Sequence, residues 1–135
     1  RTGGFTSFVP WSFKPGGSAL STQVPVAAHP ARYVRLLALA RLFLDNIDHV
    51  QSSWFSESVN AGQLGLLAGA DDFGGLLVEE NVLRETGHAR STTLAEVLAM
   101  IRAAGFTPAR RNSDYEVVER YGAGDVGACQ RCRKI

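Results

Sequence analysis

An excess of one charge sign and a long apolar run are both missing from this sequence. Its 14 basic and 13 acidic residues give a formal net charge of +1 without clustering by sign, which argues against a nucleic-acid partner. The best candidate for a membrane helix, residues 33–44, is interrupted by Arg35 and Arg41 and is shorter than the roughly 18 to 20 apolar residues that a span needs. No signal peptide is visible, so we expect a cytoplasmic protein without a membrane partner.

Cysteine is also scarce, because the chain has two and both lie near its end, at Cys129 and Cys132. A CxxC pair supplies half of a zinc site or a redox pair, but no second CxxC or pair of histidines completes a ligand set. We therefore predict no metal site in this chain, and a flexible tail over residues 122–135. No order of serine, histidine and acid suggests a hydrolase.

Strand and helix patterns alternate along the rest of the chain. The predicted strands cover residues 4–13, 47–55, 72–78 and 106–111, the predicted helices cover residues 30–44, 59–68 and 94–104, and residues 113–124 are expected to form a charged helical turn or two. The helix over 94–104 has the clearest signals, because Thr93 and Glu96 form a capping box and Gly105 follows its end. The helix over 30–44 is apolar on nearly every side, which predicts that it is heavily buried.

The alternation of short strands with helices is typical of parallel βα units and predicts an α/β protein. A doubly wound sheet usually carries a glycine-rich phosphate turn after its first strand, and neither GxGxxG nor GxxxxGK[ST] occurs there. We therefore favour a (β/α)8 barrel of the TIM type. Because that fold takes typically about 250 residues, this chain would contain only its last three or so βα units, and the barrel would be incomplete.

Four acidic residues surround the third predicted strand, in the stretch GADDFGGLLVEENV. Buried acids are costly unless they are paired or used, and barrel active sites lie at the C-terminal ends of the strands. We therefore predict Asp72, Glu79 and Glu80 as candidate catalytic residues that bind sugar hydroxyls or accept a proton, with Asn81 beside them as a substrate-binding residue. Because side chains alternate along a strand, Glu79 and Glu80 cannot both point inward. The alternative is a solvated loop acid, or an acid paired with a nearby arginine.

Polar side chains also lie on one face of the second predicted strand, where Gln51 and Ser53 are two positions apart. Polar residues on a central parallel strand are unexpected unless they line a cavity, so both are predicted to bind the substrate. Trp11 and Trp54 lie near the ends of the first and second strands, where each ring either stacks on an aromatic substrate or packs between strand and helix. His49 is interpreted as structural. We expect one of the predicted acids to face the same concavity as Gln51 and Ser53, without an arginine in contact.

The chain contains, in this order, the four stretches GGFTSFVPWSFKPG, ARLFLDNIDHVQSSWF, GQLGLLAGADDFGGLLVEENVL and IRAAGFTPARRNSDYEVV. In this order and at these spacings, they resemble the C-terminal portion of the cyclic dehypoxanthinyl futalosine synthase family, which are radical S-adenosylmethionine enzymes of menaquinone biosynthesis. The resemblance covers about residues 3–121. Aminofutalosine synthase and the second half of the deazaflavin (FO) synthase are similar in the same region.

The resemblance implies that residues 1–121 are the C-terminal part of a radical S-adenosylmethionine barrel domain, whose missing N-terminal half would be their partner. The full enzyme would hold S-adenosylmethionine and a 4Fe-4S cluster, and would cyclise the small molecule dehypoxanthine futalosine. The CxxxCxxC ligands of that cluster are absent from this chain, so the piece alone is expected to be inactive. The alternative is a non-catalytic binding module that kept the substrate end of the barrel.

Overall fold

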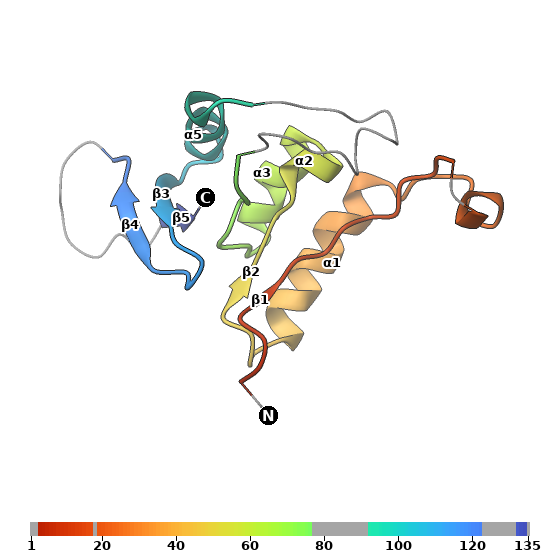
Figure 1. Cartoon of the computed structure of the whole chain (residues 1–135), viewed down its shortest axis with the longest axis horizontal. Coiled ribbons are helices and arrows are strands. Elements are labelled where there is room, and N and C mark those ends of the chain that lie inside the picture. The colour runs from red at the N-terminus through yellow and green to blue at the C-terminus, as the bar shows by residue number, and fades with distance from the viewer. Residues whose placement is uncertain (1–2, 18, 77–91, 123–131, 135) are drawn as a thin grey trace.

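The computed structural model describes residues 3–17, 19–76, 92–122 and 132–134. Its elements are β1 (Ser7–Phe8), η1 (Ala19–Thr22), α1 (Pro30–Phe43), β2 (His49–Val50), α2 (Trp54–Glu57), α3 (Val59–Leu67), α5 (Leu94–Ala103), β3 (Thr107–Arg111), β4 (Val117–Arg120) and β5 (Cys132–Lys134). In Figure 1, β1 and β2 run side by side, with α1 on one flank and the sheet of β3, β4 and β5 on the other. The predicted site residues Glu79, Glu80 and Asn81 lie outside the described residues.

Three short parallel segments form the centre of the fold. β1 and β2 pair in parallel, with Ser7 opposite His49. A third segment joins them, because Gln51 forms a parallel bridge to Asp72 and the Ser52 amide donates to the Asp72 carbonyl over 2.7 Å. The segments are neighbours in chain order and are connected by helices, as the sequence predicts for βα units. The chain is therefore a mixed α/β structure.

The strands are shorter than the sequence predicts. β1 and β2 have two residues each, where the predicted strands cover residues 4–13 and 47–55. After β2 the chain turns into helix α2 at Trp54, so the prediction that the strand continues to residue 55 is wrong. Residue type shows which positions suit a strand, but a strand continues only while its neighbour supplies hydrogen-bond partners.

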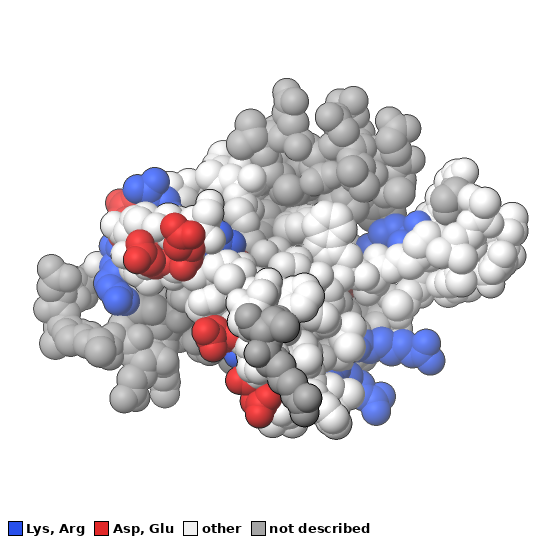
Figure 2. Space-filling model, turned by 60° about the horizontal axis from the view of Figure 1, so that its bottom comes forward, with Lys and Arg blue, Asp and Glu red and all other residues white. Residues whose placement is uncertain are grey.

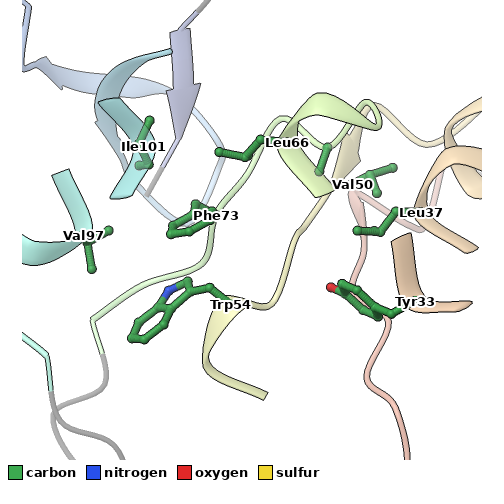
Figure 3. Packing of buried hydrophobic residues seen from close by; sticks show 9 residues of the cluster. Tyr33, Leu37, Val50, Trp54, Leu66, Phe73, Val97 and Ile101 are labelled. Carbon is green, nitrogen blue, oxygen red and sulfur yellow. The ribbon is translucent and has the colours of Figure 1, made fainter. Parts of the chain in front are cut away.

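An apolar cluster connects the helices to these segments. Its buried members are Tyr33, Leu37, Val50, Trp54, Leu66, Ala70, Phe73, Val97 and Ile101. In Figure 3, the Trp54 and Phe73 rings lie between side chains of α5 and side chains of α1. Helix α3 approaches closely because it carries Gly65, where an added Cβ would lie 2.1 Å from Ser52 Oγ and 2.6 Å from Leu37 Cδ1.

Helix α1 begins and ends close to its predicted bounds, but its burial differs from the prediction. Its buried residues are Tyr33, Leu37 and Ala40, while Leu42 and Phe43 are 78% and 82% exposed. The prediction of heavy burial is therefore wrong for this chain. A helix that is apolar on every side is buried only where another element covers it.

The last described elements form a sheet. β3 confirms the strand predicted at 106–111, and β4 pairs with it in an antiparallel hairpin. The prediction of helical turns at 113–124 is therefore wrong for β4, where Val117 and Val118 are β-branched and suit a strand once β3 offers an edge. β5, which includes Cys132, pairs with the other edge of β3 and lies within the residues predicted as a tail.

Helix α5 confirms the predicted capping box. Thr93 Oγ1 accepts a hydrogen bond from the Glu96 amide over 3.3 Å, and the Thr93 amide donates to Glu96 Oε2 over 2.8 Å. The bond from the Thr93 backbone is the main cause that lowers the pKa of the Glu96 carboxyl. The stability that this charge contributes is therefore present at neutral pH and is lost as pH falls through the lowered pKa.

We expect Thr93→Ala to lower the free energy of unfolding of the complete protein by about 1 kcal/mol, the usual effect of a lost N-cap. Denaturant unfolding followed by circular dichroism measures the loss. Thr6→Ala, at an exposed position outside the helices, is the control and should change little. Equal losses from the two variants would contradict the prediction.

Candidate functional site

The candidate site lies at the C-terminal ends of the three parallel segments. The chain leads from β1 to Trp11 and from β2 to Gln51 and Ser53, while Asp72 stands on the third segment. Neighbouring parallel segments end at the same edge of a sheet, so residues that are distant in sequence meet there.

Gln51 and Ser53 lie together at this edge, although Ser53 is the N-cap of α2 and no longer part of the strand. Both residues are buried, and Gln51 Nε2 lies 3.4 Å from Ser53 Oγ. Gly74 lies against them with a φ of +82°, and a Cβ in its place would lie 2.9 Å from Gln51 Nε2. Only glycine allows the backbone to approach the amide this closely. We call Gln51, Ser53, Asp72 and Gly74 the polar cluster.

Tyr33 of α1 supports the polar cluster from the helix side. The Ser53 amide donates to the Tyr33 hydroxyl over 2.7 Å. Burial raises the pKa of that hydroxyl above its ordinary value, so it stays protonated at neutral pH.

Asp72 is fully buried and both of its carboxylate oxygens have partners. Oδ1 accepts a hydrogen bond from the Gly74 amide over 2.7 Å, and Oδ2 accepts one from Arg111 Nε over 2.7 Å. The expectation of an acid without an arginine in contact is therefore wrong for Asp72. The arginine comes from β3, which is 39 positions away, so no local pattern indicates it.

A second acid, Asp71, connects the other end of the segments to α1. Its Oδ1 accepts hydrogen bonds from Arg41 Nη2 over 2.6 Å and from the Val50 amide over 2.8 Å. Its Oδ2 lies 2.6 Å from His49 Nδ1. His49, interpreted as structural from the sequence, is the first residue of β2 and contacts this acid.

Glu57 is a buried acid that the sequence does not indicate. Its side chain is 1% exposed, and Oε2 lies 3.3 Å from Lys14 Nζ. Oε1 accepts a hydrogen bond from the Ser12 amide over 3.0 Å. These contacts connect the chain after Trp11 to helix α2. The two residues of the ion pair are 43 positions apart in the sequence.

The two tryptophans have different surroundings. Trp11 is 49% exposed as a residue, and its ring meets the Phe55 ring edge to face, with centres 5.3 Å apart. Trp54 is 1% exposed as a residue, and its ring stacks on the Phe73 ring with centres 6.2 Å apart. The sequence leaves stacking and packing open for both residues, and the structure places Trp54 in the core and Trp11 at the surface.

A pocket of about 530 Å³ is lined by Gly75, Leu76, Leu94, Arg110, Glu119 and Tyr121. None of the four residues of the polar cluster is among its described lining residues, so we assign the pocket no part in the candidate site. On the face shown in Figure 2, basic and acidic side chains are interspersed with uncharged residues.

The described part of the chain has neither a cluster of metal-binding side chains nor a helix that could span a membrane. Residues 3–17, 19–76, 92–122 and 132–134 contain no group of three or more histidine, cysteine, aspartate or glutamate side chains that could hold a metal ion. No helix in these ranges is both long and apolar enough to cross a membrane.

Comparison with known proteins matches the chain to one family model and to enzymes that are named for two different reactions. The family model described as the CofH/MqnC C-terminal region matches residues 2–123. The cyclic dehypoxanthine futalosine synthases of Streptomyces coelicolor and Halalkalibacterium halodurans are 40% and 36% identical across 86% and 87% of this chain. A 5-amino-6-(D-ribitylamino)uracil–L-tyrosine 4-hydroxyphenyl transferase of Methanopyrus kandleri is 40% identical across 89% of it. The chain spans 29%, 31% and 34% of the length of these three relatives.

Proposed function

We propose a function from the fact that this chain belongs to the CofH/MqnC family, whose C-terminal region it matches. In this proposal the chain is the substrate-facing part of an enzyme that cyclises dehypoxanthine futalosine. Two of the similar proteins are named for that reaction. The observation that carries the proposal is the polar cluster, because it gathers a buried amide, a hydroxyl and a carboxylate at one end of parallel segments. Enzymes built on parallel sheets bind their substrates at that end.

The proposed protein is a (β/α)8 barrel of which this chain forms the last βα units. Two features support this. β1 pairs with β2 along one edge, and no described strand pairs with its other edge. On α1, exposed Leu36, Leu39 and Phe43 follow one another at helical spacings of three and four, so they form an apolar stripe. Further βα units would cover both the open edge and this stripe.

The full-length protein would use S-adenosylmethionine and a 4Fe-4S cluster, which supply a radical when bound. The residues present do not fit the cluster, because it needs three cysteines and this chain has Cys129 and Cys132. Another part of the protein would therefore hold it, and no step through the cluster is assigned to this chain.

The chain's own residues would bind and orient the substrate. Gln51 and Ser53 offer an amide and a hydroxyl for hydrogen bonds to sugar hydroxyls, and the exposed ring of Trp11 offers a surface for an aromatic ring. Because Arg111 and Gly74 occupy both oxygens of Asp72, we assign Asp72 to holding the site together. One of Glu79 and Glu80 remains the proposed group that accepts a proton, with Asn81 as a proposed substrate contact.

Turnover of dehypoxanthine futalosine by the complete protein tests this function. We expect Gln51→Leu to lower kcat/KM by about tenfold, as for the loss of a hydrogen bond to the substrate. Gln23→Leu, at an exposed position, is the matched control and should match the wild type. A wild-type protein that forms no cyclic product under reducing conditions would refute the proposal.

The related hydroxyphenyl transferase reaction is a second candidate, because the Methanopyrus kandleri protein and the Streptomyces coelicolor protein are each 40% identical to this chain over the aligned residues. Offering 5-amino-6-(D-ribitylamino)uracil with tyrosine to the same preparation distinguishes the two. Product from that mixture alone would favour the transferase. Binding of either substrate without turnover would favour the non-catalytic module.

A further inference from the structure

Strand β3 directs two neighbouring arginines to different partners. Arg110 pairs with Glu119 on the surface, where their side chains are 57% and 46% exposed. Arg111 instead donates to buried Asp72. The pairing of β3 with β4 changes register between these two arginines, and such an irregularity re-aims a side chain. The two adjacent arginines therefore have different partners. Arg110 contacts an acid at the surface, and Arg111 contacts an acid of the candidate site.

Tyr115 holds the Arg111 side chain in this position. The guanidinium carbon of Arg111 lies 4.2 Å from the centre of the Tyr115 ring. The His49 ring stacks on the same ring at 4.0 Å, with the planes 8° apart. Two groups at these distances cannot share one face, so the Tyr115 ring lies between them.

The backbone of Tyr115 indicates that these contacts matter. Its φ is +64°, which L residues rarely adopt and which glycine or asparagine usually supplies in a hairpin turn. A tyrosine at such a position is retained only when its surroundings outweigh the strain, and residues of this kind gather at functional sites.

Asp72 transmits the position of Arg111 to the polar cluster. One carboxylate oxygen accepts from Arg111, and the other accepts from the Gly74 amide. Gly74 in turn lies against the Gln51 amide, since an added Cβ would come within 2.9 Å of it. A shift of the guanidinium would therefore move the carboxylate, the Gly74 backbone and the Gln51 side chain together.

We propose that Arg111, held by Tyr115, is a positioning residue of the candidate site that sets the Gly74 backbone and the Gln51 amide through Asp72. The inference rests on the proposed function, because it assigns Arg111 to the same substrate site. It adds the β3–β4 hairpin, which follows α5 and lies outside the three parallel segments, to the elements that build that site.

Arg111→Gln and Arg110→Gln in the complete protein form a matched pair, because each removes one guanidinium from adjacent positions. We expect Arg111→Gln to lower kcat for dehypoxanthine futalosine by roughly tenfold to a hundredfold, the effect of a small displacement at a substrate site. KM should change much less, and Arg110→Gln should match the wild type in both. The assays are run at a temperature at which circular dichroism shows both variants folded, so that a loss of stability alone does not lower kcat.

Hydrogen exchange measured by mass spectrometry on residues 70–76 gives a readout that needs no substrate. The Gly74 amide should exchange about tenfold faster in Arg111→Gln than in Arg110→Gln, because its acceptor is no longer held. Arg111→Lys keeps the charge but loses the planar fork, so it should restore only part of the protection. Tyr115→Phe keeps the ring and should match the wild type, while Tyr115→Gly should change exchange in the same direction as Arg111→Gln.

The two readouts separate this inference from the proposed function. If Arg111→Gln and Arg110→Gln have the same exchange rates at residues 70–76 and the same kcat, the inference is wrong. An active wild type would still support the proposed function in that case. If the wild type is inactive, the proposed function fails and the exchange data alone decide whether Arg111 positions the cluster. If Arg111→Gln does not fold, Arg111→Lys and Tyr115→Gly are compared with Arg110→Gln by the same criteria.

Discussion

Glu57→Ala should lower the free energy of unfolding of the complete protein by about 3 to 5 kcal/mol, the usual cost of breaking a buried ion pair. The carboxylate is almost fully buried and contacts Lys14, whose side chain is 12% exposed. It also accepts the Ser12 amide. Removing the carboxylate leaves the Lys14 ammonium and the Ser12 amide without this acceptor. Because little water reaches them, each loses free energy of interaction that is not replaced. Denaturant unfolding followed by circular dichroism measures the loss.

Two variants test whether burial is the reason. Glu119→Ala removes a carboxylate from an exposed pair with Arg110, so it should cost at most about 1 kcal/mol. The double variant Lys14→Met with Glu57→Leu replaces both charges by apolar groups and should cost less than Glu57→Ala alone. If Glu57→Ala and Glu119→Ala cost the same, the ion pair does not hold the chain after Trp11 against α2.

Gly65→Ala should lower the free energy of unfolding by about 3 kcal/mol, in the upper part of the range for an overpacked core. Alanine favours a helix over glycine by about 1 kcal/mol, but the added Cβ would overlap Ser52 Oγ and Leu37 Cδ1 at 2.1 and 2.6 Å. Ser52 cannot turn away freely, because its hydroxyl donates to the Gly62 carbonyl over 2.9 Å. The overlap therefore outweighs the gain in helix propensity.

Thermal melts of the complete protein measure this effect. Gly17→Ala is the control, because an added Cβ there meets nothing within 4 Å, and its melting temperature should stay near that of the wild type. A melting temperature for Gly65→Ala that equals or exceeds the wild-type value would show that α3 can move away from Ser52 at little cost.

Signals that act within about four residues locate helices α1, α3 and α5. Helix α1 begins at residue 30 as predicted, where the His29 ring caps it by accepting the Ala31 amide. Thr93 and Glu96 form the predicted box at α5. Gly69, with a φ of +110°, follows the end of α3, whose bounds lie close to the predicted 59–68. Each of these devices is complete within one turn of helix, so the sequence is enough to locate it.

Partners that are distant in sequence determine the rest, and the tertiary structure alone decides them. The β strands end where their neighbours stop offering hydrogen bonds, which residue type does not show. The contacts of Asp72 with Arg111 and of Glu57 with Lys14 join positions 39 and 43 apart. The amino-acid sequence was thus enough to predict the α/β order and to find the stretches that resemble the family. Which acids are paired and which tryptophan enters the core followed from packing, because burial and ion pairing depend on segments that no local pattern brings together.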